Sequence, residues 1–257
     1  MRPGDVPWPA PGPPGWLAHE RLGSGAPLVL IHGLGSHRQV WRPVLDEVAR
    51  HRDVIALDLP GFGASPLWPV PAAGAGRPGS VGHLADRVGA FLDALGLARP
   101  HLAGSSLGGG VALELGRRGR ARSVTAFAPV GFWGPPGRRW CRWVLGRARA
   151  ASVVLAPVLP RLVATRAGRV ALCGTFYARP GRLSPADCLG AAGALAGAPG
   201  FAAARDALPD GSEPGDASAW DPRPDGSRPA DALAGLPVTI AWGTRDLVLP
   251  YRGQARR

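Results

Sequence analysis

The sequence predicts an α/β protein with a mostly parallel sheet flanked by helices. Short apolar runs alternate with segments whose apolar residues recur at helical spacing, the pattern of strand–helix–strand units. The 257 residues are enough to bury one substantial core. The 38 glycines and 29 prolines gather near residues 1–15, 66–79 and 209–229, and the periodic segments lie largely between these stretches. We therefore expect one α/β domain with loop-rich additions.

The first half of the chain supplies two strands and two helices. The run PLVLIH at residues 27–32 is short and apolar, which predicts a buried strand. Residues 41–51 carry apolar side chains at helical spacing, so a helix there covers one sheet face. The run DVIAL at residues 53–57 is the next strand. Residues 81–95 form a second helix with one apolar stripe.

The remaining core elements surround a sharp turn. A strand over residues 101–103 leads into the turn, and a helix of small and aliphatic residues over 107–116 follows it. The run SVTAF at residues 123–127 is another strand, and VTIAW at 238–242 is the last. Because strands alternate with helices, right-handed crossovers between parallel strands are expected.

The turn itself carries a candidate nucleophile, Ser106, at the centre of the run Gly104-Ser-Ser-Leu-Gly108. A tight strand-to-helix turn holds such a hydroxyl out at the sheet edge, and small neighbours let the backbone bend that far. Ser105 is a weaker candidate because it is not the central residue of the motif. The alternative for Ser106 is an ordinary helix cap, a role that serine fills well.

Four motifs in sequence order give the chain a family resemblance. They are His32-Gly-Leu-Gly35, Asp58-Leu-Pro-Gly-Phe-Gly-Ala-Ser65, the Gly104–Gly108 turn, and Trp242-Gly-Thr-Arg-Asp246. With these motifs the chain resembles the α/β-hydrolase family, in its branch of single-chain esterases, lipases and C–C bond hydrolases with a lid. The resemblance covers roughly residues 16–130 and 230–250.

The resemblance implies acyl-transfer chemistry by a Ser-His-Asp triad on an ester or related acyl substrate. In such chemistry negative charge develops on a carbonyl oxygen and must meet preorganised N–H donors. The main-chain amides of Leu34 and Leu107 are the implied donors, with Ser106 as nucleophile. Serine at this position argues against the epoxide-hydrolase and haloalkane-dehalogenase branches, which use a carboxylate nucleophile.

The implied acid is Asp246, the only carboxylate after Asp231 in the sequence. In the family this position orients the catalytic base. The alternative for Asp246 is a cap on a following helical turn. Asp58 and Ser65, which follow an earlier strand, are assigned by the resemblance to a structural loop.

The base is where the sequence departs from the family pattern. The family order is nucleophile, acid, then histidine, yet no histidine follows His101. The resemblance places His32 in the oxyanion loop, and only His37 could approach as a surrogate base; otherwise it is a polar loop residue. The preferred hypothesis is a C-terminally truncated member that lacks the last strand, the histidine loop and the final helix. The competing hypothesis is a non-catalytic binding protein or inactive fragment, and the coding frame past Arg257 would discriminate between them.

The resemblance also divides the chain. Residues 1–15 are expected to be a flexible N-terminal tail, and residues 16–130 with 230–257 a discontinuous, incomplete hydrolase core. Residues 131–229 should form a helical lid, with a low-complexity linker at 209–229. In this lid, Trp133, Trp140, Trp143 and Phe176 are expected to line an apolar tunnel.

The lid region is strongly basic. No Asp or Glu occurs between Leu115 and Ala186, whereas fourteen arginines lie from Arg117 to Arg182. An Arg- and Trp-rich helix of this kind suits an anionic membrane surface. The alternative is a solvated face that reflects coding bias, since all 30 basic residues are arginine, with the tryptophans packed as lid core. No nucleic-acid recognition motif accompanies the charge, so nucleic-acid binding is not expected.

Other classes of function are disfavoured by composition. The three cysteines have no C-x-x-C spacing and no clustered histidines, which predicts reduced thiols and no metal site. No cofactor is implied. The N-terminal stretch lacks the basic start and apolar core of a secretory signal, and the uncharged run over residues 150–160 is too short to span a bilayer. We therefore expect a cytoplasmic protein with a small-molecule acyl substrate; the sequence does not predict which acyl group or what oligomeric state.

Overall fold

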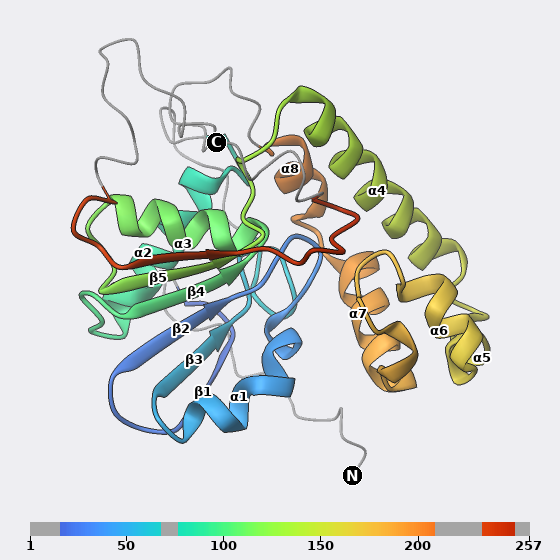
Figure 1. The fold of residues 1–257 in the computed structure, drawn as a ribbon, viewed down its shortest axis with the longest axis horizontal. Coiled ribbons are helices and arrows are strands. Elements are labelled where there is room, and N and C mark those ends of the chain that lie inside the picture. Colours follow the sequence, from blue (N-terminus) through green and yellow to red (C-terminus); the bar gives the residue numbers. More distant parts are fainter. Residues whose placement is uncertain (1–15, 68–76, 209–232, 250–257) are drawn as a thin grey trace.

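A computed structural model describes residues 16–67, 77–208 and 233–249 (Figure 1). The tail predicted at 1–15 and the linker predicted at 209–229 lie outside the described residues. The described residues form a six-stranded sheet in the order β1-β3-β2-β4-β5-β6. Its strands are β1 His19–Leu22, β2 Pro27–Ile31, β3 Asp53–Leu57, β4 His101–Ser105, β5 Ser123–Phe127 and β6 Val238–Ala241.

The five strands predicted from the sequence are confirmed, and each neighbouring pair among β2–β6 is parallel. The strand β1, which pairs antiparallel with β3 at the edge of the sheet, was not predicted from the sequence. Its four residues, HERL, are too short and polar to give a strand signal. An ion pair of 2.7 Å between Arg21 and Asp53 joins it to β3. The strand β1 is therefore recognisable only from its pairing with β3.

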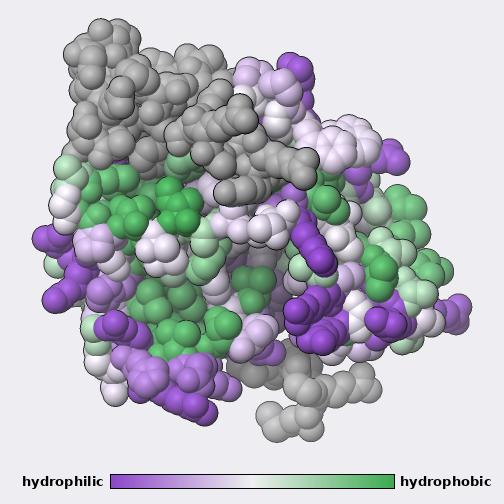
Figure 2. All heavy atoms as spheres, in the orientation of Figure 1, coloured by the Kyte–Doolittle hydropathy of each residue, from purple (hydrophilic) through white to green (hydrophobic). Residues whose placement is uncertain are grey.

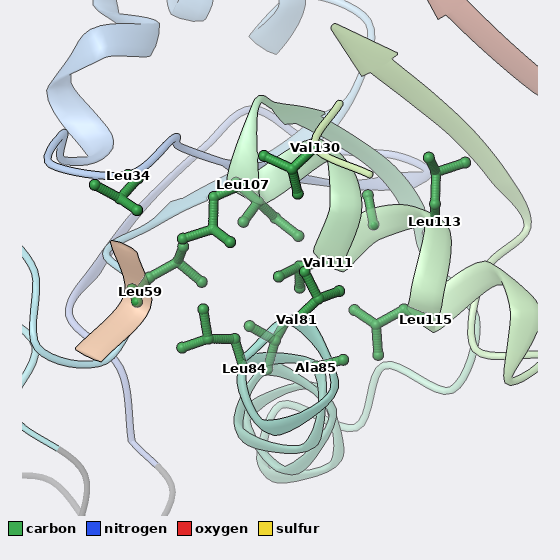
Figure 3. Packing of buried hydrophobic residues seen from close by; sticks show 14 of the residues in the cluster. Leu34, Leu59, Val81, Leu84, Ala85, Leu107, Val111, Leu113, Leu115 and Val130 are labelled. Atoms are coloured by element: carbon green, nitrogen blue, oxygen red, sulfur yellow. The ribbon is translucent and has the colours of Figure 1, made fainter. Parts of the chain in front are cut away.

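Helices cover both faces of the sheet, as predicted. One face carries α2 (Val81–Ala94) and α3 (Leu107–Arg117), and the other carries η1 (Arg38–Trp41) and α1 (Arg42–Ala49). Figure 3 shows Leu107, Val111 and Leu115 of α3 turned toward α2 within the buried core. These side chains are at most 1% exposed, so the core fixes where α3 begins. Its first residue follows Ser106 directly.

Between β5 and β6 the chain leaves the sheet as a helical insertion, here residues 131–208. Its elements are α4 Pro135–Val154, α5 Leu159–Ala164, α6 Arg166–Cys173, η2 Pro180–Arg182, α7 Pro185–Gly197 and α8 Phe201–Asp206. These helices stand to one side of the sheet (Figure 1). Leu159, Val163, Cys173 and Cys188 form a small core of their own. No helix in the described part of the chain is long and apolar enough to cross a membrane.

Candidate active site

Ser106 occupies a strained turn between β4 and α3. Its backbone angles are φ 54° and ψ −115°, a region that side-chain-bearing residues rarely adopt. The serine side chain makes no capping hydrogen bond to α3. The alternative of a simple helix cap is therefore wrong, and the turn has the geometry expected of a nucleophile elbow.

Glycines on both sides of Ser106 allow backbones to approach closely. A Cβ atom on Gly104 would lie 2.2 Å from the carbonyl oxygen of Gly108. A Cβ atom on Gly108 would lie 2.3 Å from the carbonyl oxygen of Ile31 in β2. Both distances are far inside van der Waals contact, so the fold requires glycine at these positions. The motif is thus a packing requirement of this turn as well as a sequence pattern.

The strained turn is held by main-chain hydrogen bonds. The Ser106 N–H donates to the carbonyl of Phe127 at 2.8 Å, and the Ser106 carbonyl accepts from Val130 N–H at 3.2 Å. Ala128, between these two partners, also has positive φ, at 43°. Ser106 and Ala128 are the non-glycine residues with positive φ in the described chain, and both line the same cavity. Strain of this kind concentrates at functional sites.

That cavity, the site cavity, has a volume of about 570 Å³ and brings the predicted residues together. Leu34, Ser106 and Asp246 all line it, although they follow three different strands. The Leu107 side chain is 1% exposed in the core, so only its main chain faces the turn. Neither Leu34 N–H nor Leu107 N–H donates to another described residue. Within the described part of the chain both amides are thus without a partner, a condition that an oxyanion site requires.

Asp246 orders the turn that follows β6. Its Oδ1 accepts from Val248 N–H at 2.9 Å and Leu249 N–H at 2.7 Å. The turn-capping alternative is thus observed. No hydrogen bond joins Oδ2 to another described residue, and the carboxylate still lines the site cavity. One oxygen is engaged in the turn, and the other is available to a partner.

No histidine accompanies these groups. All six histidines of the chain lie in the described residues, and none lines the site cavity. His101 sits at the start of β4, the end opposite Ser106, with Nδ1 2.7 Å from the Ser123 hydroxyl. His37 interacts electrostatically with Asp58, Arg38 and Arg42, away from the cavity. No hydrogen bond joins His37 to Ser106 in the described residues, so the surrogate base considered for His37 stays a prediction.

His32 and Asp58 support the loop that carries Leu34. The imidazole of His32 is fully buried, with Nδ1 2.7 Å from the Gly33 carbonyl and Nε2 accepting from Leu59 N–H at 2.9 Å. Burial lowers the pKa of His32 to about 4. The buried Asp58 carboxylate accepts from Arg38 N–H at 2.6 Å and from Ala64 N–H at 2.9 Å. These contacts agree with the structural role predicted for Asp58.

Sequence and structure comparisons identify the fold. A family model described as the alpha/beta hydrolase fold matches residues 26–136. A thermophilic esterase from Thermogutta terrifontis is 26% identical, with a TM-score of 0.60 over 93% of this chain and 78% of that one. The chain has the α/β-hydrolase fold, and residues 26–136 are similar to that family.

Two curated relatives that the chain matches in part are a pimeloyl-[acyl-carrier protein] methyl ester esterase and an epoxide hydrolase. The first, from Aeromonas salmonicida, is 40% identical over 96 residues, which cover 37% of this chain and 34% of the esterase. The second, EphH of Mycobacterium tuberculosis, is 62% identical over 50 residues, 20% of this chain and 23% of that protein. The curated relatives are matched over 20% to 40% of their own lengths. The relatives named here are hydrolases.

A second cavity, the apolar cavity, adjoins the first and has a volume of about 300 Å³. The two share Gly33, Leu34, Ser105, Leu145, Phe176 and Tyr177 as lining residues. Its other walls are mostly apolar side chains of α4, α5, α6 and α7, and no charged described residue lines it. Such a cavity suits an uncharged apolar group.

Part of the predicted tunnel is wrong. Phe176 lines both cavities, but Trp133, Trp140 and Trp143 line neither. Trp133 is buried against the main core, whereas Trp140 and Trp143 stack on each other at the surface, with ring centroids 5.4 Å apart. The sequence cannot tell the inward from the outward face of α4, because arginines and apolar residues alternate there.

Two cysteines meet in the wall of the apolar cavity. Cys173 Sγ and Cys188 Sγ lie 3.3 Å apart as free thiols, and both line the cavity. Burial raises the pKa of the Cys173 thiol to about 12. Reduced thiols were predicted from the sequence, but this contact was not. The two cysteines are 15 positions apart, which is not a spacing typical of paired or metal-binding cysteines. Ala128 was also missed, since alanine carries no signal for a strained backbone.

Proposed function

We propose that this chain carries the nucleophile, acid and oxyanion donors of a serine hydrolase that cleaves esters of apolar acyl groups. The observation that carries the proposal is the strained turn at Ser106, a residue that lines the site cavity with Leu34, together with the main-chain amides of Leu34 and Leu107, which donate to no described residue. Holding the backbone in this conformation costs free energy, and the start of an ordinary helix does not need such a conformation.

The proposed reaction follows from this arrangement. A base removes the hydroxyl proton while Ser106 Oγ attacks the carbonyl carbon, and the carbonyl oxygen becomes an oxyanion between Leu34 N–H and Leu107 N–H. Collapse expels the alcohol, which takes the proton, and water then releases the acid by the same route. Asp246 orients the protonated base through its second carboxylate oxygen.

We further propose that the base is an imidazole supplied by a segment outside the 257 residues. The support is the edge of the sheet, where β6 pairs with β5 alone among the described strands. Thr239 and Ile240, in the middle of β6, are exposed, and their side chains point to opposite faces. An edge of this kind has no charge or proline to block another strand. A continued sheet would bring further chain to this side of the cavity.

The test is rescue by free imidazole. Ester hydrolysis is measured with p-nitrophenyl butyrate and increasing imidazole, and the Ser106→Ala rate is subtracted to remove direct hydrolysis by imidazole. A positioned base contributes about 10²–10⁴-fold, so we expect the Ser106-dependent rate to rise at least about fivefold. Ser123→Ala, which removes a hydroxyl at the opposite end of the sheet, should respond like the unmodified chain.

Identical rates for Ser106→Ala and the unmodified chain at every imidazole concentration would contradict the nucleophile assignment. They would favour the second candidate, a non-catalytic α/β-hydrolase-like binding protein. The observation behind that candidate is the lack of any imidazole at Ser106.

The apolar cavity predicts the acyl preference. Ala192 of α7 lines it, so Ala192→Trp should fill it and lower the imidazole-dependent rate on an octanoate ester about tenfold or more, with acetate ester hydrolysis nearly unchanged. The measurement is the ratio of kcat/KM for the two esters. Ala186→Trp places the same ring on the exposed part of α7 and should keep the ratio. An unchanged ratio in Ala192→Trp would place the acyl group elsewhere.

A further inference from the structure

The helical insertion concentrates exposed apolar side chains. Of the fifteen large hydrophobic residues exposed in the described chain, eight belong to it. They are Trp140, Trp143, Val153, Val154, Val158, Leu162, Val170 and Phe176. Single exposed apolar residues are ordinary on a protein surface, but a contiguous group usually marks an interaction site.

Five of these residues lie close together in sequence, from the end of α4 to α6. We call residues 153–171 the insertion tip. Val154 is 75% exposed and Val153 is 53% exposed, at the point where α4 ends. Figure 1 places α5 and α6 at the outer side of the insertion, away from the sheet, and Figure 2 shows hydrophobic and hydrophilic side chains intermixed over this side. The apolar group therefore faces outward from the molecule.

The same surface is strongly positive. The insertion contains eleven arginines against two acidic residues, Asp187 and Asp206. Six exposed arginines have no carboxylate partner among the described residues, namely Arg139, Arg147, Arg161, Arg166, Arg179 and Arg182. Arg161 and Arg166 belong to the insertion tip itself. The insertion tip thus carries exposed valines and exposed arginines that have no carboxylate partner in the described residues, so it is both apolar and cationic.

We propose that the insertion tip docks on an anionic lipid bilayer. The valines and Leu162 enter the boundary between headgroups and acyl chains, while Arg161 and Arg166 meet the lipid phosphates. Charge alone would equally suit a nucleic acid, but a polyanion offers nothing to cover Val153, Val154 and Leu162. A bilayer satisfies both features of the surface at once.

Two further exposed apolar side chains lie in the first half of α4, whereas the insertion tip begins at its end. Trp140 and Trp143, 46% and 57% exposed, form a stacked pair on α4, and Trp140 Nε1 donates to the Leu247 carbonyl at 2.9 Å. Amphipathic indole rings favour the membrane–water interface. Leu247 directly follows Asp246 of the site cavity, so the pair marks the side of the insertion nearest the site.

The test is vesicle sedimentation, which needs no catalysis and so fails or succeeds independently of the proposed function. The chain is mixed with phosphatidylcholine vesicles that contain or lack phosphatidylglycerol, at low and high salt. We expect binding to the anionic vesicles alone and loss of binding at high salt. Each arginine near an anionic surface strengthens binding about fivefold, so the double variant Arg161→Gln/Arg166→Gln should bind about 25-fold more weakly.

Matched variants separate a membrane from other polyanions. Arg50→Gln/Arg52→Gln removes two exposed arginines from the turn between α1 and β3 and should bind anionic vesicles as the unmodified chain does. Val154→Asp, at a highly exposed position, should weaken vesicle binding at least about fivefold without a change in melting temperature. Equal binding to both vesicle types, equal losses in the two arginine pairs, or an unaffected Val154→Asp with tight binding to duplex DNA would each overturn the proposal.

Discussion

Gly108→Ala is expected to unfold the protein or leave it insoluble. The added Cβ atom would lie 2.3 Å from the Ile31 carbonyl oxygen, 2.5 Å from that of His32 and 2.7 Å from the Ile31 carbonyl carbon. All three are main-chain atoms of β2 and the loop after it, so no side chain can move to make room. Relief requires α3 to separate from the sheet, and α3 is buried along almost its whole length. We expect a loss of at least about 4 kcal/mol, a large share of the roughly 5–15 kcal/mol that stabilises an ordinary domain.

The measurement is the yield of soluble protein and, where enough is obtained, the urea midpoint. Gly193→Ala is the matched control, because Gly193 lies exposed within α7 and a Cβ atom there would meet nothing within 4 Å. Alanine is the better helix former, so this control should be stabilised by up to about 1 kcal/mol. A soluble Gly108→Ala protein with an unchanged midpoint would mean that β2 and α3 are not in this close contact.

Acid is expected to destabilise the fold through His32. Burial holds the pKa of this imidazole at about 4, against 6.5 for an exposed histidine, although Asp58 and the Gly33 carbonyl favour the charged form. His32 is therefore protonated below pH 6.5 in the unfolded chain, whereas in the folded chain it stays neutral until the pH falls to about 4. The stabilisation is complete above pH 6.5 and is lost as the pH falls to about 4. A difference of 2.5 pKa units corresponds to about 3 kcal/mol of unfolding free energy.

The check is the free energy of unfolding across this pH range for the unmodified chain and for His32→Gln. The glutamine side-chain carbonyl can still accept from Leu59 N–H, but it does not titrate. His32→Gln should be less stable at neutral pH and should show a shallower decline in acid. Burial also lowers the pKa values of His37, His83 and His101. These three histidines are present in both proteins, so they contribute the same decline of the unfolding free energy with falling pH to each. His51→Gln, at an exposed histidine, is the control; parallel curves for His32→Gln and the unmodified chain would contradict the prediction.

Much of the site followed from local sequence, because its members stand at strand ends. Leu34, Ser106 and Asp246 each come after an apolar run of strand length, and parallel strands bring their carboxyl ends to one edge. Gly104 and Gly108, on either side of Ser106, also predict the sharp turn. The antiparallel β1 could not be predicted in this way, since its four residues form a strand only through pairing with β3.

The sequence by itself determined five of the six described strands, the sharp turn at Ser106 and the lack of a histidine after His101, because these depend on local periodicity, small residues and simple occurrence. Only the tertiary structure decided which face of α4 is buried, that Trp140 and Trp143 lie outside the cavities, and that Cys173 meets Cys188. In α4, arginines are interleaved with apolar residues along the helix. Which face of such a helix is buried depends on the segments that it packs against. These segments are distant in sequence, so the sequence of the helix alone does not predict the buried face.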